Sequence, residues 1–170
     1  MPLAVVSLIW DAEKSSGSQR VTYDSDGYHL VRFPYDGESY DPWKMHDPAN
    51  GGGEDPAEFP ERRSGLIYPS HEGWGIVSAM VHWKKDGDPH EYRARFVRDP
   101  LGEDYDSTAT TDAAETGGGQ YKAYVWQFFV HRNTPIGIKI SARGKGDEKI
   151  ATPLLHAQFK LAIHTDVIVP

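Results

Sequence analysis

The chain has 170 residues, with 25 acidic and 18 basic side chains and a formal net charge of −7. A surface with this excess of carboxylates repels phosphate backbones, so nucleic acid is not an expected partner. The sequence contains no cysteine, which excludes disulfides, thiolate metal sites and a cysteine nucleophile.

The N-terminal segment Met1–Lys14 contains the first expected strand, Ala4–Trp10. Its apolar run is short, lacks a basic leader and stops at Asp11, unlike a secretory signal. An anchoring arm is the alternative interpretation of residues 1–14. Since no stretch approaches the roughly 20 apolar residues that cross a bilayer, a membrane is not an expected partner either.

Alternation of apolar and polar residues with a period of two dominates the rest of the chain, and helical periodicity is nearly absent. This pattern, with turns rich in glycine and proline between the segments, predicts strands. In chain order the expected strands are Ala4–Trp10, Gly27–Phe33, Gly65–Tyr68, Ile76–Trp83, Tyr92–Phe96, Tyr121–Val130, Ile136–Ser141 and Leu155–Ile163. Residues 35–63 and 99–119 are predicted to be long surface loops.

These features predict an all-β fold, a single two-sheet antiparallel jelly-roll sandwich of about eight to ten strands over residues 1–170. Two of the strands lack alternation: Ile76–Trp83 and Tyr121–Val130 are apolar on both sides. One packed sheet buries only one side of a strand, so a neighbouring subunit is expected to cover the other. The candidate subunit-interface residues are Ile76, Met80, His82, Tyr124, Trp126 and Phe128, with Val125 and Phe129 as the alternate set on the opposite side of the second strand.

No catalytic or metal-binding pattern stands out. The eight histidines include no HxH pair and no HExxH motif, although in a trimer one histidine per subunit can converge on an axis. The acidic turns, such as Asp36/Glu38/Asp41, do not match the twelve-residue calcium loop. The nucleophile motif GxSxG does not occur. We therefore expect a non-enzymatic protein without a cofactor or bound metal.

Aromatic residues make up 12% of the chain, and three of them, Tyr40, Trp43 and Tyr105, fall in the predicted loops. Aromatic rings exposed in loops bury a large area at low entropic cost when they contact a sugar or a protein. The alternative is that these rings fix the loops to the sandwich. The sequence is compatible with both interpretations.

The order of several degenerate motifs is similar to a known family. An aromatic-led strand and a YDP-x-x-MHDP-like segment are followed by an arginine-bearing stretch, a long apolar strand and three later strands. The matching segments are VRFPYDGESYDPWKMHDPAN (Val31–Asn50), RRSGLIYPSHEGWGIVSAMVHWKKDG (Arg62–Gly87), YRARFVRDPLG (Tyr92–Gly102), PIGIKISARG (Pro135–Gly144) and LLHAQFKLAIH (Leu154–His164). In this order they resemble the globular-head domain of complement C1q and its tumour-necrosis-factor-like relatives, in the form found in actinobacterial phages and prophages.

The resemblance implies a ten-stranded jelly roll that assembles into a compact homotrimer, with one sheet against the neighbouring subunits. It further implies a structural protein of a bacteriophage virion, assembled in the bacterial host cytoplasm. A trimeric capsid decoration protein that contacts the major capsid protein or another virion protein is the favoured form. The alternatives are a tail-fibre or baseplate domain, a module that binds a host surface glycan or receptor through loop aromatics, and an enzyme acting on polysaccharides.

Overall fold

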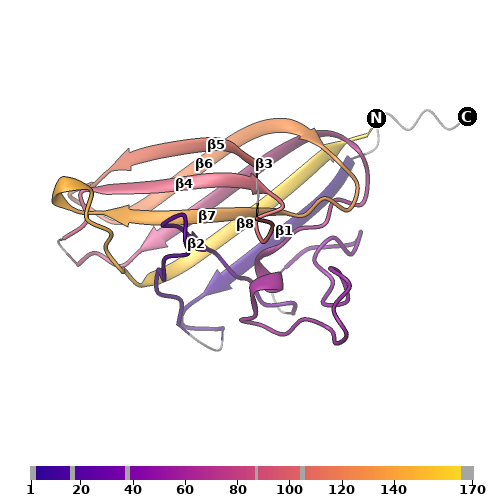
Figure 1. Cartoon of the computed structure of the whole chain (residues 1–170), viewed down its shortest axis with the longest axis horizontal. Coiled ribbons are helices and arrows are strands. Elements are labelled where there is room, and N and C mark those ends of the chain that lie inside the picture. Colours follow the sequence, from indigo (N-terminus) through magenta and orange to yellow (C-terminus); the bar gives the residue numbers. More distant parts are fainter. Residues whose placement is uncertain (1–2, 16–17, 37–38, 87, 104–105, 166–170) are drawn as a thin grey trace, which may run out of the picture.

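The computed structural model describes residues 3–15, 18–36, 39–86, 88–103 and 106–165, and the side chains of 106–109 are outside this description. The described residues form eight strands in two layers (Figure 1). The strands are β1 (Leu3–Asp11), β2 (His29–Leu30), β3 (Gly73–Trp83), β4 (Glu91–Arg98), β5 (Asp106–Ala114), β6 (Gln120–Val130), β7 (Ile136–Arg143) and β8 (Leu154–His164). Two 3-10 turns, η1 (Arg62–Gly65) and η2 (Lys145–Asp147), complete the regular structure, and no helix of the described residues is long and apolar enough to cross a membrane.

Each layer is a four-stranded antiparallel sheet. The strand orders are β1-β8-β3-β6 and β2-β7-β4-β5. Chain neighbours are therefore seldom sheet neighbours: β1 pairs with β8 at the other end of the sequence, and β3 lies between β8 and β6. This crossing connectivity is that of a jelly roll, and the predicted fold class is confirmed.

The core lies between the two sheets and follows from the period-2 pattern. Along β8, Ala157, Phe159, Leu161 and Ile163 are buried, while the residues between them are exposed or half-buried. The Phe159 ring lies 6.2 Å from the ring of Phe33 and 6.1 Å from the ring of Phe96 on the opposite sheet. Burial of these rings contributes to the hydrophobic free energy that joins the layers.

The sequence prediction was wrong about residues 99–119, because this segment contains a strand. β5 pairs with β4 along its length and forms the edge of its sheet. Its residues 110–112 are exposed. In the part of β5 whose side chains are described, residues 110–114, none is buried. Such an edge imposes no apolar alternation, so threonine and aspartate suffice and the sequence resembles a loop.

Two other predicted strands are shorter than expected. Of Gly27–Phe33 only His29–Leu30 forms a strand, and Gly65–Tyr68 contributes a single bridge between Ile67 and Ile136. Most of the segment Gly27–Phe33 is nonetheless buried, including Val31 and Phe33. Burial in an irregular segment produces the same apolar run as a strand does, so the pattern alone does not separate them.

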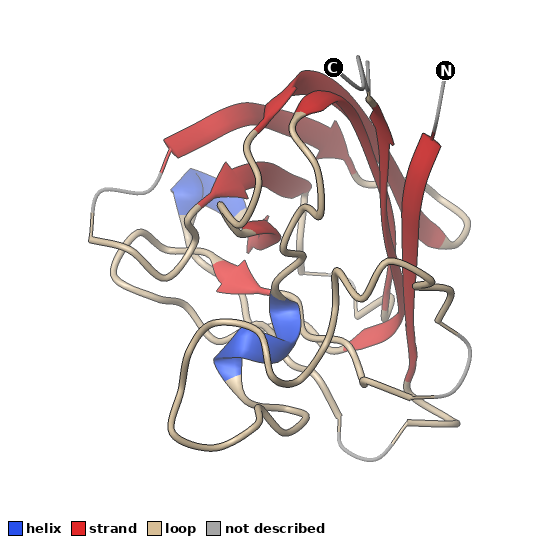
Figure 2. Cartoon of the chain, turned by 90° about the vertical axis from the view of Figure 1, so that its right-hand side faces the viewer, coloured by secondary structure: helices blue, strands red, loops and turns tan. Residues whose placement is uncertain are grey.

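The long connection between β2 and β3 is ordered by hydrogen bonds from side chains to the backbone. The Asp41 carboxylate accepts the backbone N–H groups of Met45 at 2.9 Å and His46 at 2.5 Å. The buried His46 ring is 2.8 Å from the Ser64 carbonyl oxygen through Nε2 and stacks on Tyr35. Figure 2 shows this connection as loops gathered around a short helix beside the sheets. The segment therefore packs as part of the domain.

Candidate functional site

The side of the sheet β1-β8-β3-β6 that faces away from the core is referred to here as the outer face. Residues directly opposite one another on paired strands point to the same side of a sheet, so the strand register defines this face row by row. The rows are Leu3–His164–Trp74–Phe129, Val5–Ala162–Ile76–Gln127, Ser7–Lys160–Ser78–Val125, Ile9–Gln158–Met80–Ala123 and Asp11–His156–His82–Tyr121. The backbone of Tyr40 pairs with Ser7 through two hydrogen bonds and so extends the third row past β1.

The outer face exposes several large apolar side chains. Five large side chains on it, Leu3, Trp74, Tyr121, Val125 and Phe129, are each between 45 and 63% exposed. They come from three strands that the sheet brings together. Contiguous exposed apolar patches are rare on monomeric soluble proteins and mark surfaces that contact another molecule. The outer face is therefore the candidate functional site of the chain.

The structure places the predicted interface residues in three environments. Ile76, Met80 and His82 lie half-buried on the outer face, on alternate positions of β3. Tyr124 and Phe128 point into the sandwich and are only 3 and 6% exposed, which differs from the assignment made from the sequence. The alternate residues Val125 and Phe129 lie on the outer face instead, in its third and first rows. Because both sides of β6 are apolar, its sequence does not reveal which side faces the core.

Trp126 is in a third environment, at the edge of the sandwich. It lies opposite Val77 and so shares the inward parity of Tyr124, yet it is 47% exposed. β6 is the last strand of its sheet and lies beside β5, at the edge of the other sheet (Figure 1). The indole of Trp126 is partly uncovered at this edge. We refer to β5 and β6 together as the open edge. Burial raises the pKa of the Tyr124 hydroxyl, and the negative charge of Asp112 on β5 adds to this increase.

The centre of the outer face contains a hollow of about 160 Å³, referred to below as the central hollow. Its small residues are Ser78, Ala79 and Ala123. Ser78 and Ala123 belong to the rows of the outer face and leave room between larger neighbours on three strands. Met80, Val125, Gln158 and Lys160 form its rim. No sequence pattern predicts this hollow, because its residues come from strands far apart in the chain.

One end of the outer face is polar and titratable. The His156 ring lies 3.4 Å from Asp11, measured from Nδ1 to Oδ2, and its Nε2 lies 3.2 Å from the amide nitrogen of Gln158. A neutral imidazole with its proton on Nδ1 satisfies both contacts. The His82 ring stacks on Tyr121 at 3.7 Å, and burial together with the nearby His156 lowers the pKa of His82. Asp11, His156 and His82 therefore make this end of the outer face polar.

The loop aromatics lie at and beyond the rim of the same face. Tyr40 is 61% exposed at the edge of the third row, and Trp43 is 45% exposed with its ring edge-on to His71 at 5.0 Å. Tyr105 is outside the described residues. The two described rings are therefore accessible to a partner, and Trp43 also packs against the turn that precedes β3.

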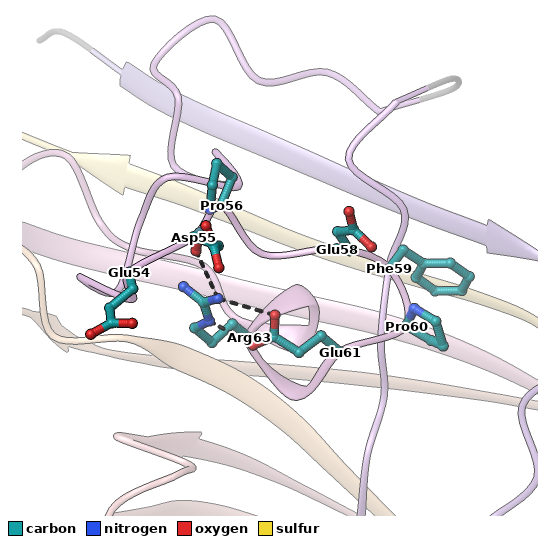
Figure 3. Close-up of a pocket in the computed structure, with 8 residues that line it drawn as sticks. All are labelled: Glu54, Asp55, Pro56, Glu58, Phe59, Pro60, Glu61 and Arg63. Carbon is teal, nitrogen blue, oxygen red and sulfur yellow. Dashed lines mark hydrogen bonds and ion pairs between the residues drawn. The ribbon is translucent and has the colours of Figure 1, made fainter.

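A second hollow lies in the long connection and has no catalytic arrangement. The hollow is lined by residues that include Glu54, Glu58 and Arg63. The Arg63 guanidinium pairs with the Glu61 carboxylate and donates a hydrogen bond to the Asp55 carbonyl oxygen (Figure 3). Pairing with Arg63 lowers the pKa of the Glu61 carboxyl. Since arginine and carboxylate neutralise one another here, the contacts stabilise the loop. Within the described part of the chain, no three histidine or acidic side chains are placed to hold a metal ion together.

The two four-stranded antiparallel sheets and their connectivity define the class of the protein as a jelly-roll sandwich. The chain is similar to the Eiger TNF of S. frugiperda, with a TM-score of 0.57, 14% identity and coverage of 100% of this chain and 98% of that chain. It is similar to the globular domain of zebrafish complement 1qA, with a TM-score of 0.61, 9% identity and coverage of 96 and 98%. For murine APRIL at pH 8.0 the TM-score is 0.57, with 9% identity and coverage of 96 and 100%.

At these identities the likeness establishes the fold alone. No protein-family model matches the sequence, and no curated protein matches it. The similarity to C1q and tumour-necrosis-factor proteins inferred from the motif order is therefore confirmed at the level of the jelly roll.

Proposed function

We propose that this chain is a non-enzymatic structural module that assembles into a homotrimer through its outer face. The observation that carries the proposal is the grouping of Leu3, Trp74, Tyr121, Val125 and Phe129 on one side of one sheet, each about half exposed or more. Covering such a surface releases roughly 25 cal/mol for each Å² of apolar area removed from water. The tumour-necrosis-factor and C1q type of fold supports a trimer in particular.

A closed trimer suits the distribution of apolar surface on this sandwich. The outer face and the open edge are two different surfaces of one chain, and both expose aromatic side chains. A heterologous contact joins one surface of a subunit to another surface of the next, and closes when the rotation between subunits completes a ring. Three subunits related in this way cover every outer face once.

The biological setting that we propose is a bacteriophage virion, with the trimer as a capsid decoration protein. The support is the order of sequence motifs that resembles the phage-type members of the C1q group, together with the exposed apolar surface. The expected partner is the major capsid protein or another virion protein, and the trimer forms in the host cytoplasm before it joins the particle. A tail-fibre or baseplate position is the alternative within the virion.

The experiment that tests this function is co-sedimentation of the purified chain with phage heads that lack it. A decoration protein saturates the heads at a fixed ratio that is a multiple of three chains. A matched control uses a Trp74→Ala variant, in which the outer face is impaired. Failure of the trimeric wild-type chain to bind any phage head or tail preparation would contradict the virion role and leave the trimer unaffected.

A second candidate function is binding of a host surface glycan, and the exposure of Tyr40 and Trp43 favours it. Stacking of a sugar ring on such rings needs no catalytic group. If this alternative holds, Trp43→Ala abolishes binding to host cells or to a glycan array and leaves the chain trimeric. Equal binding by the wild-type and Trp43→Ala chains would eliminate it.

A further inference from the structure

The open edge and the central hollow present complementary shapes on different surfaces of one chain. Trp126 projects from the inward side of β6 and is 47% exposed at the open edge. The central hollow opens on the outer face, which is the opposite side of the same sheet. A side chain with inward parity does not reach the outer face of its own sheet. Trp126 therefore needs a second molecule to enter such a hollow.

The size of the central hollow matches an aromatic group. Its volume is about 160 Å³, and Ser78 and Ala123 form its small-residue floor. A cavity of roughly 150 Å³ holds a benzene molecule in another protein, so the hollow accommodates the larger part of an indole. Met80 and Val125 at its rim supply apolar contacts for the flat faces of the ring.

Charge distinguishes a second copy of this chain from an arbitrary apolar partner. Lys160 at the rim of the hollow is exposed on the outer face. The Asp112 carboxylate is 55% exposed on the open edge, with its Oδ1 3.4 Å from Nε of Arg93. When an indole enters the hollow, the edge that carries it brings a carboxylate toward the ammonium at the rim. Opposite charges placed in this way favour the correct register of an interface.

We propose that Trp126 of one subunit inserts into the central hollow of the next, between Ser78 and Ala123. This inference rests on the proposed trimer and specifies its contact. The contact is heterologous, since projection and hollow are different surfaces, and three such contacts close a ring. The contact also explains the exposure of Trp126. Its parity on β6 is that of the core residues, yet its indole is about half exposed in a single chain.

The test measures self-association of the full chain by sedimentation equilibrium, with folding checked by circular dichroism. Trp126→Ala removes the projection, and Ser78→Trp fills the hollow. Each variant is expected to raise the protein concentration at which half of the trimer dissociates at least tenfold. Ser78→Ala keeps the hollow open, and Trp43→Ala removes an equally exposed tryptophan from the loops, so both controls are expected to stay within threefold of wild type.

The double variant Trp126→Ala/Ser78→Trp supplies a stringent check. The indole introduced at position 78 occupies the space that the missing Trp126 leaves, so the double variant is expected to assemble more tightly than either single variant. If Ser78→Trp does not fold, Ala123→Phe fills the same hollow from β6 and takes its place.

The outcomes separate this inference from the proposed trimer. Trimers of Ser78→Trp or Ala123→Phe with wild-type affinity would overturn the docking of Trp126, while the trimer itself would stand. The same holds if these variants lose binding to a glycan array and keep wild-type assembly, since the hollow would then be a sugar site. A wild-type chain that is monomeric at every concentration would instead overturn the proposed function.

Discussion

Trp74→Ala is the substitution that best separates the outer face from other exposed surface. Trp74 lies on β3 in the first row of the face, and 49% of it is exposed in a single chain. A tryptophan presents up to about 250 Å² of surface, so roughly 120 Å² remains to be covered by a second subunit. At about 25 cal/mol per Å² this corresponds to about 3 kcal/mol for each contact that Trp74 makes, or roughly a hundredfold in affinity.

Within one chain the same substitution has a small effect. The indole N–H of Trp74 donates a hydrogen bond of 3.0 Å to the Gln127 side chain, and both groups are exposed. Loss of an exposed hydrogen bond costs at most about 1 kcal/mol of unfolding free energy. The variant is therefore expected to unfold at nearly the wild-type denaturant concentration after both proteins are diluted to monomers.

The assay is sedimentation equilibrium over a wide concentration range, with Trp43→Ala as the matched control. Trp43 is 45% exposed, so the two tryptophans differ in location much more than in accessible area. The expected result is weakened assembly for Trp74→Ala and unchanged assembly for Trp43→Ala. Equal behaviour of the two variants would refute the assignment of the outer face as the interface.

Three further predictions concern the single chain. Burial lowers the pKa of His29 to about 4. Because the unfolded chain binds that proton near pH 6.5, about 3 kcal/mol of stability is lost as the pH falls from 6.5 to 4. His29→Gln should flatten this loss in denaturant titrations at several pH values. Phe159→Ala empties the ring layer between the sheets and is expected to lower the unfolding free energy by about 3–5 kcal/mol, whereas a loss below 1 kcal/mol would contradict the core assignment. Asp41→Ala removes the acceptor of two backbone N–H groups, so hydrogen exchange should accelerate in residues 41–46. The unfolding free energy should fall by about 1–2 kcal/mol at most. Unchanged protection of these residues would show that the loop does not depend on this carboxylate.

The fold could be predicted from the sequence wherever one face of a strand is buried. In β8, Ala157 to Ile163 alternate in burial as they do in hydropathy, and the sandwich follows from several such segments. β5 could not be predicted, because an exposed edge strand imposes no apolar period on its side chains. The lengths of β2 and the Ile67 segment were overestimated for the converse reason, since buried irregular backbone also selects apolar residues.

The candidate site was predictable in its elements and not in its geometry. The apolar character of β3 and β6 indicated a surface beyond the core, and Ile76, Met80 and His82 lie on the outer face. The inward placement of Tyr124 and Phe128 was not readable, because either parity of β6 yields an apolar inner row. The central hollow depends on the register of three strands and on the contrast between small and large neighbours, neither of which a single sequence contains.

The molar mass of the purified chain in dilute solution tests the central claim most directly. Light scattering coupled to size exclusion should give three times the 19.0 kDa of one chain, and the mass should hold as the sample is diluted through the micromolar range. A single species of 19.0 kDa at all concentrations would mean that the aromatic outer face stays in water without a second copy, and the trimer would be contradicted.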